Sequence, residues 1–412
     1  MIETLTRLRQ FDEAPYSSHL IVLVALVRHV QMGTTDNSLA QPLTQPHIKA
    51  GFERDKKFGR FATNIYFASL QLTSSQIASA MEVEQEQIVF SWLSGADEEH
   101  CPKFMVITDH ETASVVLIIR GTLCFKDILM DVVCEEAEFL DGVGHEGFLS
   151  GSRMILEKCS SVLERTLREH LGYELVVCGH SMGGSVAEML TLELLEDHSQ
   201  QILPPGVSVH CVALGPAPVY RARGELADLY RERVRIYIND RDVVPHLSLG
   251  SVANFLVVLR EIDNLGLTLD EQLAVIMWRQ DEETVSNRER VRRVASSAQQ
   301  DQFDFLHHPG QVTRVFSSGE DIALEEQSPE QGLLMAENLE IFETMISDHL
   351  HTSYRFNLNK GSFQNKTIAK IGYLAQASIL LPLYGPVFLR LLRHYFAHQY
   401  KGREGLTFLK TN

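Results

Sequence analysis

The junction at residues 174–184 constrains the fold most. Glu174-Leu-Val-Val-Cys178 has the pattern of a short apolar strand, and it runs directly into Gly179-His-Ser-Met-Gly183, after which Ser185–Leu195 has a helical pattern. A sharp strand-to-helix turn around Gly-x-Ser-x-Gly exposes a serine hydroxyl above a sheet, because the small residues relieve crowding. The sequence therefore predicts that Ser181 is a nucleophile capable of attacking an ester carbonyl.

Further apolar runs alternate with helical patterns. Lys103–Thr122 predicts two strands joined at Asp109-His110-Glu111, and the second strand, Ser114–Arg120, is almost wholly apolar between its ends, which suits burial on both faces of a mostly parallel sheet. Other predicted elements are strands at Val209–Leu214, Val234–Ile238 and Gln311–Phe316 and a long helix at about Phe148–His170. This alternation predicts an α/β fold with a parallel central sheet between helical layers.

The length of 412 residues, 44% of them hydrophobic, allows one large domain with appendages. We expect a leader at 1–50 and a catalytic domain at 51–360. The change to charged helical segments predicts an insertion at about 254–304, and an apolar helical extension follows at 361–412.

Charge and cysteine content narrow the function. A formal net charge of −17 argues against nucleic acid as a main partner, because phosphate binding needs clustered lysine and arginine. The six cysteines contain no CxxC pair and no metal-site spacing, so we expect free thiols, a cytoplasmic location, and neither a metal nor a cofactor.

Two apolar stretches bear on membrane contact. Leu20–Val27 follows acidic residues and lacks a cleavage site, which favours a buried or membrane-leaning helix over a signal peptide. Ile371–Leu389 carries no charge and approaches the length of a bilayer span, but Pro382, Gly385 and Pro386 interrupt it. We expect two short helices there, packed on the core or dipping into a membrane interface.

A serine nucleophile needs a base and a carboxylate that orients it. In a chain of this organisation the acid follows a later strand and precedes the histidine. After Val234–Ile238 come Asp240 and Asp242, and either could cap a turn. Asp242 is preferred because it opens a rigid Val-Val-Pro segment.

Position selects the base among seventeen histidines. His246 follows the acid too soon, and His307 and His308 precede a predicted strand whose far end they could not easily reach. His349 follows the last predicted strand with enough chain to return to the site, and His351 is the second choice. The backbone N–H of Met182, at the start of the helix after Ser181, is expected to stabilise the oxyanion.

The chain resembles the class 3 lipases, which are fungal-lipase-like α/β-hydrolases, and within them the diacylglycerol-lipase-like branch. The likeness covers about Phe58–Phe356. Its segments, in order, are Ile119-Arg120-Gly121-Thr122 with Asp127 and Asp131, His145-Glu146-Gly147-Phe148, Gly179–Gly184, Asp242-Val-Val-Pro245, His308-Pro309-Gly310 and Asp348-His349.

The resemblance implies the α/β-hydrolase fold and a triad of Ser181, Asp242 and His349. It also implies that Thr122 joins Met182 in the oxyanion hole, and that Leu123–Leu140 is a lid, although an ordinary surface helix is the alternative. The expected activity is hydrolysis of acylglycerol esters at a peripheral membrane or lipid-droplet surface. Phospholipase A1 or galactolipase activity, and a non-catalytic lipid-binding fold, are the alternatives.

Three departures from the small secreted fungal lipases favour the intracellular branch: the chain has no convincing signal peptide, no evident disulfide framework, and 106 residues between Asp242 and His349. In the diacylglycerol lipases an insertion between acid and base is regulatory, so 254–304 is a candidate to cover the site. The four transmembrane helices that precede the catalytic domain in some diacylglycerol lipases are not expected here, so their mode of membrane attachment is not carried over to this chain.

Overall fold

The computed structural model describes most of the chain between residues 46 and 359. The described ranges are 24–27, 46–71, 73–93, 101–122, 136–196, 203–226, 228–297, 304–318, 321–337, 339 and 344–359. The whole 371–389 stretch and the larger part of the expected lid, 123–135, lie outside them.

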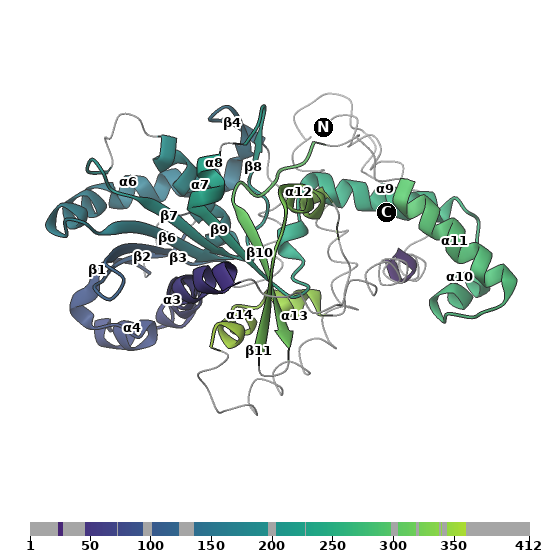
Figure 1. Cartoon of the computed structure of the whole chain (residues 1–412), viewed down its shortest axis with the longest axis horizontal. Helices are drawn as coiled ribbons and strands as arrows, with labels where there is room; N and C mark the ends of the chain where they lie inside the picture. Colours follow the sequence, from purple (N-terminus) through teal and green to yellow (C-terminus); the bar gives the residue numbers. More distant parts are fainter. Residues whose placement is uncertain are drawn as a thin grey trace, which may run out of the picture.

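An eight-stranded sheet forms the centre, in the order β1-β2-β3-β6-β7-β9-β10-β11 (Figure 1). Its strands are β1 (Ile88–Trp92), β2 (Phe104–Asp109), β3 (Ser114–Ile119), β6 (Glu174–His180), β7 (Val209–Leu214), β9 (Val234–Asn239), β10 (Gln311–Ser318) and β11 (Asp321–Glu326). The five strands from β3 to β10 are parallel, whereas β1, β2 and β11 pair in antiparallel fashion at the two edges. This is the expected mostly parallel α/β-hydrolase sheet.

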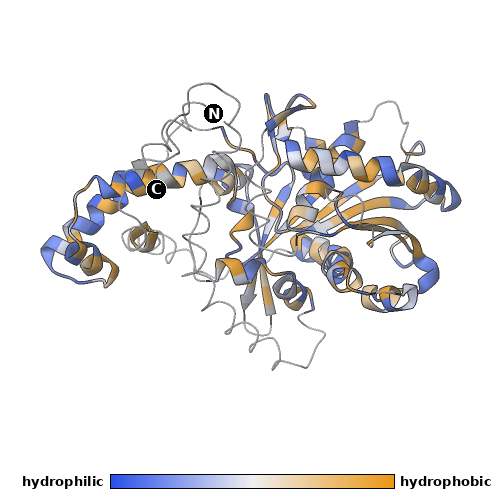
Figure 2. Cartoon of the chain, turned by 180° about the vertical axis from the view of Figure 1, so that it is seen from behind, coloured by the Kyte–Doolittle hydropathy of each residue, from blue (hydrophilic) through white to orange (hydrophobic). Residues whose placement is uncertain are grey.

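Helices cover both faces of the sheet (Figure 1). On one face lie α6 (Glu146–Glu169) and α7 (Met182–Glu196), and on the other lie α3 (Pro46–Ala68), α4 (Ser74–Met81) and α14 (His351–Leu358). The sheet strands are mostly hydrophobic (Figure 2), and their side chains divide between two core clusters, one for each face. Apolar burial on both faces explains why the strands have continuous apolar sequences.

Shorter elements complete the chain. A second sheet, in the order β4-β5-β8, contains β4 (Glu136–Phe139), β5 (Gly142–His145) and β8 (Tyr220–Ala222). The remaining elements are η3 (Gln85–Gln87), α8 (Asp228–Arg233), η4 (Val244–His246), α12 (Pro329–Glu337) and α13 (Met345–His349).

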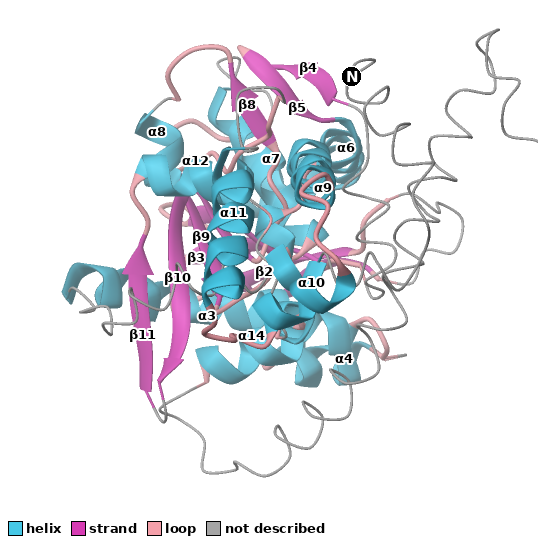
Figure 3. Cartoon of the chain, turned by 90° about the vertical axis from the view of Figure 1, so that its right-hand side faces the viewer, coloured by secondary structure: helices cyan, strands magenta, loops and turns pink. Residues whose placement is uncertain are grey.

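Three helices between β9 and β10 form what we call the arm: α9 (Leu249–Asp263), α10 (Leu269–Ile276) and α11 (Glu282–Ser297). Figure 1 shows α10 at the end of the arm far from the sheet, and Figure 3, viewed from that side, shows α10 and α11 in front of the sheet. The arm corresponds to the expected helical insertion. The expected boundaries at residues 51 and 254 fall inside helices, in α3 and α9 respectively.

Part of the helix expected at Leu20–Val27 falls within the described residues. The described residues 24–27 are helical, and Leu26 and Val27 are buried with the larger core cluster. Within the described residues, no helix is long and apolar enough to cross a membrane.

Candidate active site

Ser181 lies in a strained turn between β6 and α7. Its φ of 60° is in the left-handed region, which non-glycine residues rarely occupy, and its N–H donates to Leu214 O at 2.8 Å. A Cβ on Gly179 would collide with the backbone of Gly183, and a Cβ on Gly183 would collide with Ile119 O. The two glycines therefore permit the close backbone approach that holds the serine at the carboxyl end of β6.

The structure brings the predicted serine, histidine and aspartate together from three separate segments. Ser181 Oγ lies 2.8 Å from His349 Nε2, and His349 Nδ1 lies 2.9 Å from each carboxylate oxygen of Asp242. All three side chains are buried. Because a carboxylate only accepts, Nδ1 carries the proton and Nε2 is free to accept from the serine hydroxyl. This is the tautomer that a general base requires.

Asp242 is held by donors on both oxygens. Val244 N–H donates to Oδ1 at 2.9 Å, and the Tyr354 hydroxyl donates to Oδ2 at 2.6 Å. The same hydroxyl accepts from Asn239 N–H at 3.0 Å. Burial and the neighbouring Asp242 carboxylate raise the pKa of Tyr354 well above its ordinary value, so the hydroxyl stays protonated and remains a donor.

Gly215 makes room for this arrangement. It follows β7 with a φ of 52°, and a Cβ there would overlap Asp242 Oδ2 and lie 2.5 Å from the Tyr354 hydroxyl oxygen. A side chain at this position is therefore excluded both by the left-handed backbone and by the acid itself.

A second histidine, His180, is hydrogen-bonded to the backbone of the base. His180 Nε2 lies 2.8 Å from the carbonyl oxygen of His349, so Nε2 is the donor, and His180 Nδ1 then accepts from the Tyr66 hydroxyl at 2.9 Å. Burial, with smaller effects from His349 and His351, lowers the pKa of His180 well below 6.5. A neutral His180 matches this one-donor, one-acceptor pattern.

The second choices for acid and base lie outside the triad. Asp240 has a φ of 44° and bonds through its backbone to β10, at Val315 O. His351 stacks on Tyr66 with ring centroids 4.3 Å apart, and burial is the main cause that lowers its pKa to about 4. The two ring nitrogens of His349 are bonded to Asp242 and Ser181 instead.

The other histidines that the sequence analysis rejected as the base also make contacts away from Ser181. His246 Nδ1 donates to Met335 O at 2.9 Å, and His308 Nε2 donates to Pro245 O at 3.0 Å. His307 joins the short β8 strand through a bridge to Tyr220. His308 therefore ties the strand entry at residues 308–310 to the loop that carries the acid.

The two oxyanion candidates are neighbours. Thr122 follows the end of β3, Met182 begins α7, and the Thr122 hydroxyl donates to Met182 Sδ at 3.4 Å. Two peptide segments thus meet beside Ser181, as an oxyanion hole built from two loops requires. Among the described residues, no group of three or more histidine, cysteine or acidic side chains is arranged to hold a metal ion.

Sequence reasoning missed the residues that support the triad. Tyr66, His180 and Tyr354 come from α3, the end of β6 and α14. His180 lies within the Gly-x-Ser-x-Gly pentapeptide, so the sequence could have pointed to it. The two tyrosines lie at helix positions whose pattern predicts only core packing. His145 of the family-like segment caps α6, where it accepts from Phe148 N–H at 3.4 Å.

Residues 116–251 match the family described as Lipase (class 3). Over these residues the chain is similar to the class 3 lipases. The match includes Thr122, Ser181, Met182 and Asp242, and it ends before His349.

The chain is also similar to diacylglycerol lipase-beta of Mus musculus, with 28% identity over 171 residues, or 40% of this chain and 24% of that protein. A lipase of Rhizopus niveus is 26% identical over 148 residues, covering 34% of this chain and 36% of that protein. The chain thus spans about a quarter to a third of the length of these curated relatives. Among solved structures, the match to the triacylglyceride lipase of Rhizomucor miehei covers 77% of this chain and 97% of the lipase chain. The sequence identity is 13% and the TM-score is 0.48.

Proposed function

We propose that this protein hydrolyses carboxylic esters of acylglycerols through an acyl-enzyme on Ser181. The observation that carries the proposal is the continuous chain of hydrogen bonds from Ser181 Oγ through His349 to Asp242, with distances of 2.8 and 2.9 Å. A hydroxyl, a base and an orienting carboxylate in this order make serine nucleophilic.

The residues have distinct roles in the proposed reaction. Ser181 Oγ attacks the ester carbonyl carbon while His349 Nε2 takes its proton, and the backbone amides of Thr122 and Met182 stabilise the negative oxygen. The carbonyl–alkoxy bond then breaks, and His349 returns the proton to the departing alcohol. Water, deprotonated by His349, releases the fatty acid and restores Ser181. Asp242 keeps His349 oriented, and these steps use no metal or cofactor.

Acylglycerol as the substrate class is supported by the relatives, whose names are lipase and diacylglycerol lipase. We place the catalytic domain at about 51–360, with its first helix beginning at Pro46, and the extension at 361–412 outside it. A cytoplasmic protein acting at a membrane or lipid-droplet surface is the setting that we propose.

A panel of lipid substrates tests the proposal. Mono-, di- and triacylglycerol emulsions are compared with phosphatidylcholine vesicles, using wild type and Ser181→Ala. We expect the acylglycerols to be cleaved fastest and Ser181→Ala to lose turnover while its melting curve is unchanged. Faster cleavage of phosphatidylcholine would favour phospholipase A1 activity instead, and equal turnover by Ser181→Ala would exclude Ser181 as the nucleophile.

A further inference from the structure

The far end of the arm exposes an apolar surface, which we call the arm tip: Leu269, Leu273, Met277 and Trp278. Their exposed fractions are 57%, 39%, 58% and 43%. Leu269 and Leu273 are four residues apart and share one face of α10, and Met277 follows at the same spacing as the C-cap, while Ala274 and Val275 are buried. Exposed single apolar residues are common, but a contiguous group at the end of a projecting element indicates contact with something.

The local structure of α10 fixes this face in position. Thr268 caps the helix by accepting from Glu271 N–H, and the Glu271 carboxylate accepts from Thr268 N–H at 2.7 Å. Trp278 lies in the turn just after α10 with a φ of 52°, a rare conformation for a bulky residue.

Arg288 on α11 stabilises that turn. Its guanidinium carbon lies 4.2 Å from the centroid of the Trp278 ring, and its Nη2 donates to Arg279 O at 3.0 Å. The indole is thus held at the surface beside the α10 face. Around it, α11 is largely hydrophilic (Figure 2).

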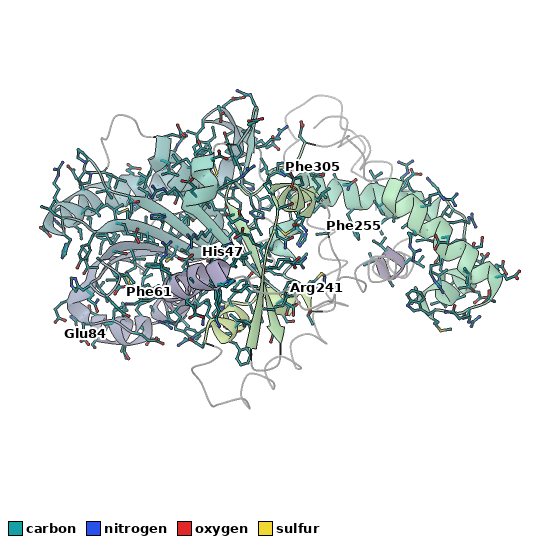
Figure 4. The ribbon with its side chains drawn as sticks, in the orientation of Figure 1. His47, Phe61, Glu84, Arg241, Phe255 and Phe305 are labelled. Carbon is teal, nitrogen blue, oxygen red and sulfur yellow. The ribbon has the colours of Figure 1, made fainter. Side chains whose placement is uncertain are left out.

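The arm is attached near the candidate active site. It begins at Leu249, shortly after Asp242, and the chain returns from it to β10 ahead of His349. Figure 4 labels Arg241, next to Asp242, and Phe255 on α9 at the base of the arm. The arm is therefore inserted in the chain between the acid and the base of the candidate triad.

The small size of the arm tip favours a lipid surface over a protein as its binding partner. A stable protein–protein interface takes about 20–30 residues a side, and four side chains fall far short of that. A second copy is further disfavoured because the chain carries a net charge of −17. A lipid surface needs no matched partner surface, and a tryptophan beside leucine and methionine suits the boundary between acyl chains and headgroups.

We propose that the arm tip inserts into a zwitterionic or uncharged lipid surface and so carries the enzyme to its water-insoluble substrate. This proposal rests on the proposed function for the nature of the occupant. The exposed carboxylate of Asp270 at the start of α10, together with the net charge, disfavours a strongly anionic surface.

Fluorescence provides a specific test, because the chain has only two tryptophans, Trp92 and Trp278. In full-length protein carrying Ser181→Ala and Trp92→Phe, phosphatidylcholine vesicles with brominated acyl chains should quench the emission of Trp278 and shift it to the blue. The Ser181→Ala background prevents hydrolysis from altering the vesicles. Should Trp92→Phe fail to fold, Trp278→Phe in its place should abolish the lipid-dependent quenching.

A matched pair of double variants tests the apolar face itself. Leu273→Ser with Met277→Ser should weaken binding to phosphatidylcholine vesicles by about tenfold or more, because two exposed apolar side chains lose their lipid contact. The control, Leu171→Ser with Leu229→Ser, removes exposed apolar groups that precede the amino ends of β6 and β9, whereas the arm follows the carboxyl end of β9. It should bind like wild type.

Activity separates this inference from the proposed function. The arm variant should hydrolyse a soluble short-chain ester at the wild-type rate and lose activity only on emulsified acylglycerol. Vesicle binding without quenching of Trp278, or equal binding by the two double variants, would overturn the arm proposal and leave the chemistry of Ser181 intact. A lipid-independent emission shift that follows protein concentration would identify a second copy as the occupant and would also overturn it.

Discussion

Single hydroxyl and amide groups fix the geometry of the acid. Asp242 is buried completely, and its oxygens are satisfied by His349, by Val244 N–H and by Tyr354. A buried carboxylate deprived of one donor loses both free energy and orientation. Each such donor is therefore expected to affect the rate more than the fold.

Tyr354→Phe tests this at the residue scale. The variant removes only the hydroxyl that donates to Asp242, so we expect kcat/KM for a soluble ester to fall about tenfold, consistent with about 1.5 kcal/mol for a hydrogen bond to a charged group. Tyr173→Phe is the control, because that hydroxyl bonds to His110 away from the site. Equal rates for Tyr354→Phe and wild type would show that the contact does not position the acid.

The sequence predicted the three triad residues but not the tyrosines and the histidine that hold them in place. Ser181 follows from a local pattern, and Asp242 and His349 follow from the order of strands along the chain. Tyr66 meets His180 across 114 positions, and Tyr354 meets Asp242 across 112, so no local pattern contains either contact. Both tyrosines occupy apolar helix faces, where an aromatic residue predicts core packing and nothing more.

At the scale of elements, the parallel strands and β2 were predictable, and the outermost strands β1 and β11 were not. β3, β6 and β7 are almost fully buried and therefore have continuous apolar sequences. β4 (Glu136–Phe139) and β11 (Asp321–Glu326) contain acidic residues, which mask the alternation on which strand prediction relies. β1 and the small second sheet were missed for a related reason, since short or half-exposed strands give little periodicity.

Turns after strands also determine activity, and two glycines offer a matched comparison. Gly215 and Gly172 both have positive φ, 52° and 89°, but a Cβ on Gly172 meets no atom within 4 Å. Gly172→Ala should therefore cost about 1 kcal/mol of stability from backbone strain alone, with kcat unchanged. Gly215→Ala should destabilise the protein by several kcal/mol and reduce kcat/KM at least about a hundredfold, because the methyl group displaces Asp242 and Tyr354.

Melting curves and soluble-ester kinetics for the two variants decide the matter. Similar activity in both would show that the space at Gly215 is not needed by the acid. A loss of stability in Gly215→Ala without any loss of activity would point to backbone strain as the whole effect.

At the scale of the whole molecule, one buried histidine, His180, and two half-buried ones, His307 and His351, couple stability to pH. The pKa of His180 lies well below its ordinary value, and those of His307 and His351 are lowered to about 4, in each case mainly because burial disfavours the charged ring. In the unfolded chain these histidines take up protons near pH 6.5, whereas in the folded protein they remain neutral at that pH. Their contribution to stability is therefore present above about pH 6.5 and is lost as the pH falls from there toward 4.

Urea unfolding at a series of pH values from neutral to about 5 measures this coupling. Each histidine contributes up to about 1.4 kcal/mol per pH unit to the slope, so His351→Gln should flatten the decline in unfolding free energy. His47→Gln, which changes an exposed histidine on α3, serves as the control and should leave the slope as it is. An unaltered slope in His351→Gln would contradict the assignment.

The central claim is that Ser181, activated by His349, is the nucleophile. It is tested most directly by labelling the intact, folded protein with a fluorophosphonate and locating the adduct by mass spectrometry. We predict one adduct, on the peptide containing Ser181, formed at a rate that falls by several orders of magnitude in His349→Ala. A folded wild-type protein that fails to label at Ser181, or a His349→Ala variant that labels equally fast, would contradict the account.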